Sequence, residues 1–272
     1  MMGFAVIVGA ELANPDALRS SLFNLLLGFV TGFALTAASM AINDYYDREI
    51  DAVNEPKRPI PNGVVKPNEA LVLAFILAIV GFTAAYLITY LTKSDLCLLI
   101  AVISWIVSVA YTTVGKRSGL PGNFLVSVCV AIPFVYGSAI VSNSITLNSW
   151  FFVAMVIPSI TGREVTKGIV DKRGDEMRGV KTLAVRYGER KAAIAAAFFY
   201  LLAVAISPIP WILGIVSFWY VLLVALTDFG LTVSSFMLVK DYSRENARRI
   251  KNVVLLWFIV GLLAFIVGSF SF

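Results

Sequence analysis

The feature that most constrains this chain is a series of long apolar runs along its whole length. Nine runs can be marked, and most approach the ~20 residues that a helix needs to cross about 30 Å of hydrocarbon. They cover residues 1–13, 22–43, 69–92, 95–114, 122–142, 147–168, 190–207, 211–239 and 247–269. We therefore expect an all-α polytopic membrane bundle of about nine transmembrane helices. A β-barrel would instead show alternating segments of about ten residues.

The first run, residues 1–13, is shorter than the others and would reach roughly 20 Å as a helix. Either this helix crosses the membrane incompletely or the natural chain begins upstream of Met1. A signal peptide is the alternative, but no Lys or Arg precedes the apolar residues.

The composition excludes several classes of protein. The chain is 59% hydrophobic and only 14% charged, which does not fit a water-soluble domain. Histidine is absent, so a histidine base, a histidine metal ligand and a Ser-His-Asp triad are all excluded. The two cysteines, Cys97 and Cys129, lie inside apolar runs and do not suggest a disulfide framework.

Basic residues indicate how the bundle is oriented. If the nine runs alternate in direction, one side of the membrane receives only Arg19 and Lys93, and the other receives the remaining 20 of the 22 Lys and Arg residues. The positive-inside rule makes that second side cytoplasmic. We therefore expect a multi-pass protein of the cell membrane whose long loops face the cytoplasm. The net charge of +5 then reflects topology, and no nucleic-acid partner is expected.

Residues 43–51, which read NDYYDREID, form a first acidic motif at the end of the second run. On a helix, Asp47 lies about 60° and Asp51 about 20° from Asp44, so the three carboxylates share one face with Asn43 beside it. Such a stripe is favourable only next to a cation, and hard oxygen ligands suit Mg²⁺. The alternative is a solvated helix end with ordinary surface carboxylates.

A second acidic motif follows the sixth run, where Asp171 and Asp175 are spaced by four residues. Taken alone, this spacing is typical of an ion-paired surface helix. Four runs separate Asp51 from Asp171, however, and an even number brings both motifs to the same side of the membrane. The 127 residues between Asp44 and Asp171 also suggest two related four-helix halves.

Two carboxylate motifs at the mouth of an apolar bundle imply a ligand with a charged head and an apolar tail. A diphosphate that is bridged to the protein by Mg²⁺ and joined to a long hydrocarbon chain has both properties. The basic residues that we expect to contact the phosphates are Lys116, Arg163, Lys167 and Arg173. The alternative role for Arg173 is an anchor to anionic lipid headgroups.

Three segments carry a resemblance to a known family. They are NDYYDREIDAVNEPKRPIPNG at residues 43–63, DKRGD at 171–175 and KTLAVRYG at 181–188. Together they resemble the UbiA-type intramembrane prenyltransferases, and the resemblance covers nearly the whole chain. It implies one transmembrane prenyltransferase domain over residues 1–272, with cytoplasmic active-site loops at about 44–68 and 163–189.

The resemblance also implies roles for individual residues. In this family the two acidic motifs bind Mg²⁺ and the diphosphate of a prenyl donor, whose tail lies in an apolar cavity open to lipid. The residues that correspond to the metal side are Asn43, Asp47, Asp171 and Asp175. Asp44 and Asp51 would orient the site or the acceptor. Tyr111 and Lys116 resemble the family's Tyr and Lys pair at the end of the fourth helix.

This resemblance implies a chemistry in which Mg²⁺ and basic side chains take up the charge that develops on the leaving diphosphate. The allylic C1–O bond of the donor weakens, and an electron-rich acceptor attacks the carbocation-like carbon. No strong base is required. An apolar bundle would protect such a carbon from water.

The acceptor is suggested by residues 47–63, which look most like archaeal lipid-forming members that transfer geranylgeranyl to geranylgeranylglyceryl phosphate. They look nearly as much like chlorophyll synthases. The alternatives are therefore tetrapyrrole esterification and aromatic-ring prenylation in quinone biosynthesis, of the 4-hydroxybenzoate or naphthoate type. In each case we expect a prenyl diphosphate donor, a lipophilic acceptor and a surrounding lipid bilayer.

Two other classes of membrane protein are weighed against this interpretation. An ion-coupled transporter predicts charges at mid-membrane depth, and the one plausible acid there is Asp228, whose role the sequence does not assign. A CDP-alcohol phosphotransferase also uses acidic motifs in a membrane. Its DGxxAR signature is missing from this chain.

Overall fold

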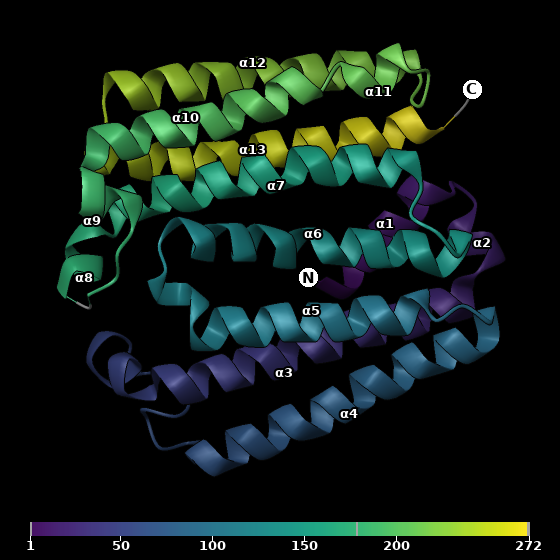
Figure 1. The fold of residues 1–272 in the computed structure, drawn as a ribbon, viewed down its shortest axis with the longest axis horizontal. Coiled ribbons are helices and arrows are strands. Elements are labelled where there is room, and N and C mark those ends of the chain that lie inside the picture. Colours follow the sequence, from purple (N-terminus) through teal and green to yellow (C-terminus); the bar gives the residue numbers. More distant parts are fainter. Residues whose placement is uncertain (1, 178, 271–272) are drawn as a thin grey trace.

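The computed structural model describes residues 2–177 and 179–270, which form long helices lying roughly side by side (Figure 1). No strand occurs in this described part of the chain. The long helices among these residues are α1 (Met2–Ala13), α3 (Leu22–Asn54), α4 (Pro67–Thr92), α5 (Leu96–Thr113), α6 (Leu120–Ser142), α7 (Leu147–Val170), α10 (Glu189–Ile206), α12 (Phe218–Lys240) and α13 (Arg244–Ser269). Short segments connect them, namely α2 (Ala17–Ser20), the 3-10 turn η1 (Gly115–Arg117), α8 (Lys172–Met177), α9 (Leu183–Tyr187) and α11 (Ile209–Ile212).

Each of the nine apolar runs corresponds to one long helix in the described residues, so the all-α prediction is confirmed. Seven of these helices are long and apolar enough to cross a membrane. The other two are α1, which has only 12 residues, and α7, whose last two turns carry charged side chains. Two boundaries differ from the runs. α3 continues to Asn54, and α12 begins only at Phe218, after a turn in which Gly214 has a φ of +68°.

The helices form two groups of four. α3, α4, α5 and α6 pack together, and α7, α10, α12 and α13 form the second group, with α6 against α7 between them (Figure 1). Each group has its own apolar core, one around Ile88 and Tyr136 and the other around Tyr200 and Val254. This arrangement agrees with the two related halves expected from the spacing of the acidic motifs.

Helix α1 lies against α6 at very close range because glycines face each other's backbone. A Cβ atom added to Gly137 of α6 would overlap the carbonyl oxygen of Val6, and one added to Gly9 would overlap the backbone of Phe134. Small residues at helix crossings allow such close approach in membranes, where dispersion contacts replace the hydrophobic effect. The contact fixes α1 beside the junction of the two halves.

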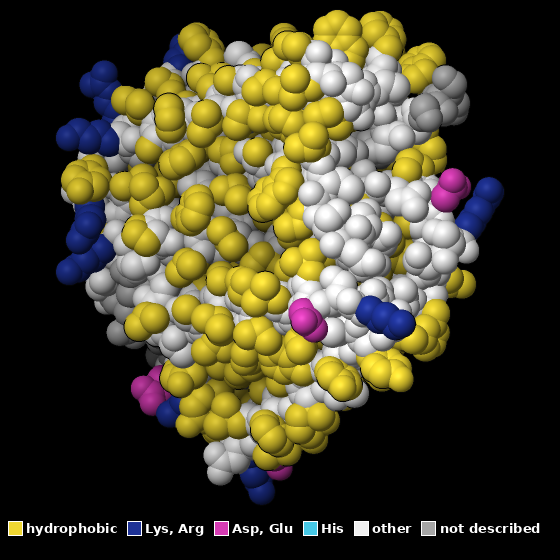
Figure 2. Space-filling model, turned by 45° about the vertical axis from the view of Figure 1, so that its right-hand side comes forward, with side chains coloured by type: hydrophobic (Ala, Val, Ile, Leu, Met, Phe, Trp, Pro, Cys, Tyr) yellow, Lys and Arg dark blue, Asp and Glu magenta, His cyan; other side chains and the backbone are white. Residues whose placement is uncertain are grey.

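The outer surface is apolar. Hydrophobic side chains cover most of the face in Figure 2, and a row of Lys and Arg side chains stands at its left edge. Large side chains such as Phe75, Phe198 and Phe236 are more than half exposed. In water such a surface would be unfavourable, whereas in a bilayer it faces lipid tails. The chain is therefore built as a multi-pass membrane protein.

The connections that carry most of the charge meet at one end of the bundle. The α3–α4 connection, η1, and the short helices α8 and α9 all lie at the left end in Figure 1. The apolar runs cross an even number of times between the two acidic motifs, and the structure brings both motifs to this end as expected.

Candidate active site

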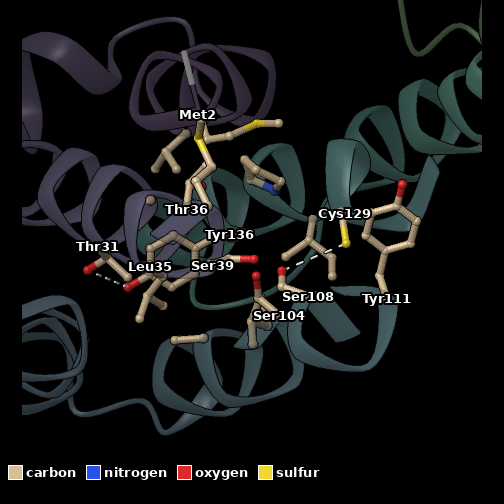
Figure 3. Close-up of a pocket in the computed structure, with 17 residues that line it drawn as sticks. Met2, Thr31, Leu35, Thr36, Ser39, Ser104, Ser108, Tyr111, Cys129 and Tyr136 are labelled. Atoms are coloured by element: carbon tan, nitrogen blue, oxygen red, sulfur yellow. Dashed lines mark hydrogen bonds between the residues drawn. The ribbon is translucent and has the colours of Figure 1, made fainter. Parts of the chain in front are cut away.

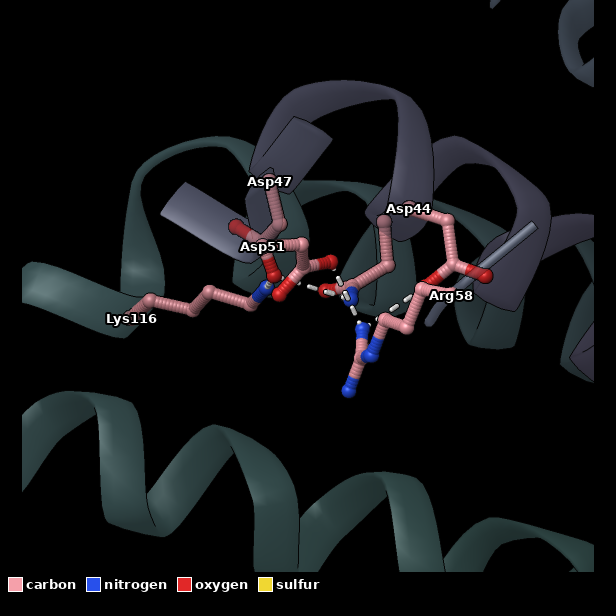
Figure 4. Close-up of polar contacts among 6 residues, drawn as sticks. Asp44, Asp47, Asp51, Arg58 and Lys116 are labelled. Carbon is pink, nitrogen blue, oxygen red and sulfur yellow. Dashed lines mark hydrogen bonds and ion pairs between the residues drawn. The ribbon is translucent and has the colours of Figure 1, made fainter. Parts of the chain in front are cut away.

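The first acidic motif lies on the last three turns of α3, which remains helical beyond its apolar part. Asp51 is only 7% exposed, while Asp44 and Asp47 are partly buried. Arg58, from the connection after α3, folds back over this face. Its Nη1 atom lies 3.2 Å from Asp44 Oδ1 and 2.8 Å from Asp51 Oδ2 (Figure 4). One guanidinium group therefore bridges two of the three carboxylates.

The third carboxylate of this motif has a different cation. Lys116 of η1 places its Nζ atom 2.5 Å from Asp47 Oδ2 (Figure 4). Asn43 donates a hydrogen bond from its amide nitrogen to the same oxygen at 3.0 Å. The structure thus brings together Asn43 and Asp47, which we expected on the metal side, and Lys116, which we expected at the phosphates.

In this arrangement each of the three carboxylates has a cationic side chain of the protein as its partner. Two cations stand against three carboxylates on one helix face, which offsets the repulsion among like charges at these spacings. Within the described residues, no three His, Cys, Asp or Glu side chains converge as a metal-binding group. A metal ion held here would complete its coordination with water or with oxygens of a bound substrate.

The second acidic motif is placed on a break between helices. Asp171 ends α7 and is exposed, while Asp175 lies in α8 and is partly buried. The backbone N–H of Asp175 donates to the carbonyl oxygen of Asp171 at 3.0 Å, so the expected one-turn spacing is kept across the break. Arg173 is exposed at the same end of the bundle.

Two of the basic residues that we expected at the phosphates are paired with an acid on their own helix. Glu164 Oε1 lies 3.2 Å from Arg163 Nη1, and Glu164 Oε2 lies 3.5 Å from Lys167 Nζ. The Glu164 side chain is only 12% exposed. Tyr111 of α5 is close enough to interact electrostatically with both Glu164 and Asp47. Its ring therefore lies within electrostatic range of one acid from each half.

A cavity of about 150 Å³ extends from this charged end into the bundle between α1, α3, α5 and α6. Tyr111 lies at one end of it and Thr31 at the other, with Ser104 and Ser108 between them (Figure 3). Met40 of α3, one turn before Asp44, also lines the cavity. The cavity thus begins next to the first acidic motif.

A second cavity of about 490 Å³ lies on the other side of α6, between α7, α12 and α13. Its wall is almost wholly apolar and includes Phe134, Phe258 and Phe265. Asp228 is the acid in this wall, and its Oδ2 atom accepts a hydrogen bond from Ser207 Oγ at 2.5 Å. This contact ties α12 to the end of α10.

Two residues of the charged end were missed by the sequence analysis. Arg58 belongs to the quoted segment KRPIPNG, but it lies past the end of α3, where helical periodicity gives no information. Glu164 did leave a signal, because it precedes Asp171 by seven residues and therefore shares its helix face. The expected phosphate contacts were instead assigned to Arg163 and Lys167, the basic residues on either side of Glu164.

Comparisons with known proteins show the family of this chain. Residues 2–269 match the model of the UbiA prenyltransferase family. A digeranylgeranylglyceryl phosphate synthase from Archaeoglobus fulgidus is 39% identical over 274 residues, covering 99% of this chain and 91% of the relative. Both matches include the two acidic motifs.

Solved structures share the fold. The structure of a digeranylgeranylglyceryl phosphate synthase in membranes superposes with a TM-score of 0.85 at 31% identity, covering 98% of this chain and 92% of that one. A UbiA homologue from Archaeoglobus fulgidus bound to GPP and Mg²⁺ gives a TM-score of 0.68 at 13% identity, covering 97% and 95%. These matches favour a transferase over an ion-coupled transporter. The chain belongs to the UbiA prenyltransferase family and is a multi-pass membrane prenyltransferase.

Proposed function

We propose that this enzyme transfers a geranylgeranyl group from geranylgeranyl diphosphate to geranylgeranylglyceryl phosphate in a Mg²⁺-dependent reaction. The observation that carries the proposal is the cluster of carboxylates and cations that lies next to the start of a cavity inside an apolar bundle. A ligand that fits both parts needs an anionic head and a long hydrocarbon tail. The name of the Archaeoglobus fulgidus relative supports this acceptor over aromatic or tetrapyrrole acceptors.

The residues present fit a magnesium ion that is shared with a substrate. Carboxylate and amide oxygens are the ligands that Mg²⁺ prefers, and it usually binds to one or two carboxylates plus phosphate oxygens. No preformed cage exists among the described residues, which agrees with that mode. The residues that we propose for the metal side are Asn43, Asp47, Asp171 and Asp175. When bound, the metal would supply positive charge to the leaving diphosphate.

In this scheme the basic side chains of the site can pair either with carboxylates of the protein or with oxygens of the diphosphate. In the structure, Lys116 and Arg58 pair with the carboxylates of α3. Once a diphosphate is bound, the same side chains lie within reach of its oxygens, and Arg163, Lys167 and Arg173 approach from the second half. Asp44 and Asp51 would then orient Arg58. Charge-assisted hydrogen bonds of this kind are strongest where water is excluded.

Apolar space for prenyl chains is available on both sides of α6. The proposed donor and the proposed acceptor each carry a geranylgeranyl chain, and the cavities lie on opposite sides of α6. Tyr111 lines the smaller cavity near the charged end, and we propose that its ring lies beside the reacting carbon. An aromatic face stabilises a neighbouring cation. The surrounding apolar walls would keep water from the carbocation.

We further infer that the whole chain, residues 1–272, acts as one catalytic domain with its charged end in the cytoplasm. The active-site segments at about 44–68 and 163–189 begin within α3 and α7 and continue into the connections that follow. The inference on sidedness rests on the basic residues, because 20 of 22 belong to this end if the helices alternate.

The proposal is tested with the purified protein in lipid vesicles and labelled geranylgeranyl diphosphate. The acceptors are geranylgeranylglyceryl phosphate, 4-hydroxybenzoate and a tetrapyrrole acid, each offered alone. We expect a labelled ether lipid only with the first acceptor, and no product when EDTA replaces Mg²⁺. Prenylation of an aromatic or tetrapyrrole acceptor, with geranylgeranylglyceryl phosphate left unchanged, would overturn the proposal.

A further inference from the structure

The proposed reaction leaves a proton that needs an acceptor. Glycerol has three oxygens, and in geranylgeranylglyceryl phosphate one carries the prenyl chain and another the phosphate. Attack by the third, a hydroxyl, on C1 of the donor forms an oxonium that must lose its proton. This requirement rests on the proposed function, and the electrostatic stabilisation of diphosphate departure does not meet it.

Most carboxylates of the site are already engaged by cations from other elements. Arg58 holds Asp44 and Asp51, and Lys116 holds Asp47. Asp171 and Asp175 lie at the outer end of the second half. Glu164 differs, since it pairs with Arg163 and Lys167, neighbours on its own helix, at 3.2 and 3.5 Å.

The position of Glu164 matches the place where a reacting carbon would lie. It precedes Asp171 by seven residues on the same helix face, which sets it about 10 Å deeper in the bundle. Tyr111 lies near enough to interact with it and also lines the cavity that begins at the charged end. A diphosphate at Asp171 with its chain directed inward would thus bring its first carbon towards Glu164.

The segment that carries Glu164 is held firmly. Thr161 shares a buried hydrogen bond of 2.8 Å with Ser127 of α6, and Thr166 shares one of 3.0 Å with Tyr200 of α10. Beside Glu164, the Nε atom of Arg163 is buried without a hydrogen-bond partner. A buried unpaired donor is costly unless a ligand satisfies it. The unpaired Arg163 donor points to a polar substrate group at this position.

We propose that Glu164 is the catalytic residue that accepts the proton of the acceptor hydroxyl. As the C1–O bond to the diphosphate breaks, the hydroxyl oxygen forms the new C1–O bond, and its proton passes to a Glu164 carboxylate oxygen. The products are the diether phosphate, diphosphate and the proton, so atoms and charge balance. Because an alkylated oxonium is a strong acid, the Glu164 carboxylate is a sufficient base for this proton.

The test compares Glu164→Gln with the wild-type enzyme in vesicles. Ether formation from geranylgeranyl diphosphate and geranylgeranylglyceryl phosphate is measured together with release of geranylgeraniol, the product of capture by water. We expect ether formation to fall about 100-fold, the typical scale for loss of a general base. Binding of the thiolo analogue of the donor, which resists ionisation, should stay unchanged, and the share of geranylgeraniol should rise.

Two further variants separate chemistry from folding. Glu164→Asp keeps the carboxylate and should recover part of the ether formation lost in Glu164→Gln. Glu245→Gln changes an exposed glutamate in the first turn of α13, outside both active-site segments, and should match the wild type.

Each remaining outcome is decisive. Ether formation at the wild-type rate in Glu164→Gln overturns the role of Glu164 alone. Loss of analogue binding in that variant also overturns it, because Glu164 would then belong to the donor site. A wild-type enzyme that forms no ether from this acceptor overturns the proposed function, and the role of Glu164 with it.

Discussion

At an offset of 120 residues along the chain, Asp51 of the first half corresponds to Asp171 of the second, and Asp44 corresponds to Glu164. The two places are nevertheless built differently. α3 continues three residues past Asp51, which is buried, whereas α7 ends at Val170 and leaves Asp171 exposed.

Their counter-charges differ as well. On α3, both cations come from elsewhere in the chain, Lys116 from a position 69 residues away. On α7, Glu164 is paired with residues next to it in the same helix. The position that is Asp47 in the first half is Lys167 in the second. The charged face of the first half therefore consists mainly of carboxylates, whereas that of the second half contains acidic and basic side chains side by side.

We expect the largest loss of activity from a substitution in the first acidic motif. Asp47→Ala removes a proposed metal ligand and leaves Lys116 without its partner at 2.5 Å. Prenyl transfer should fall by about 1,000-fold or more, judged from other losses of transition-state charge stabilisation. The rate is measured with labelled geranylgeranyl diphosphate in vesicles. Glu49→Ala, which changes an exposed acid on the same helix, is the matched control. Full activity in Asp47→Ala would show that the first acidic motif does not belong to the active site.

The same substitution in the second half should have the next largest effect. Asp171→Ala removes an exposed carboxylate on a helix break, and we expect transfer to fall by about 100-fold with a higher Mg²⁺ requirement. A magnesium titration of the initial rate measures both. Glu176→Ala, a nearby exposed acid that lies 4.0 Å from Lys172, should keep its activity. If Asp171→Ala behaved like this control, one motif alone would bind the diphosphate.

Substitutions of Arg58 test whether its ion pairs with Asp44 and Asp51 orient the first acidic motif for catalysis. Arg58→Ala leaves Asp44 and Asp51 unbridged, and kcat/KM for the donor should fall about 10- to 100-fold, the usual range for residues that orient metal ligands. Arg58→Lys should lose less, because both contacts of Arg58 run through a single nitrogen. Donor saturation curves distinguish the variants. Equal losses in both would indicate that the planar guanidinium itself is needed.

The smallest effect concerns the support of the second half. Tyr200→Phe removes the hydrogen bond of 3.0 Å to Thr166, and the free energy of unfolding should fall by about 1 kcal/mol. Thermal unfolding in detergent measures this loss, with Tyr90→Phe on the exposed face of α4 as the control. Activity should fall less than in Arg58→Ala. An inactive but fully stable Tyr200→Phe would show that this hydroxyl acts beyond packing.

The sequence by itself determined the spans, the two halves and the common end of the two motifs. The length of an apolar run and the number of crossings are properties of the chain that no neighbouring helix alters. The shared face of Asp44, Asp47 and Asp51 also follows from helical geometry alone, since all three lie within α3. These features are local, and the structure agrees with them.

The tertiary structure decided which charges meet. Arg58 reaches α3 because the proline-containing connection folds back, and Lys116 reaches Asp47 because α5 packs against α3. Neither contact follows from periodicity, which ends where a helix ends. The electrostatic interaction of Glu164 with Tyr111 likewise depends on how the two halves pack against each other. Ion pairs depend on distances across the bundle, and packing of the helices sets those distances.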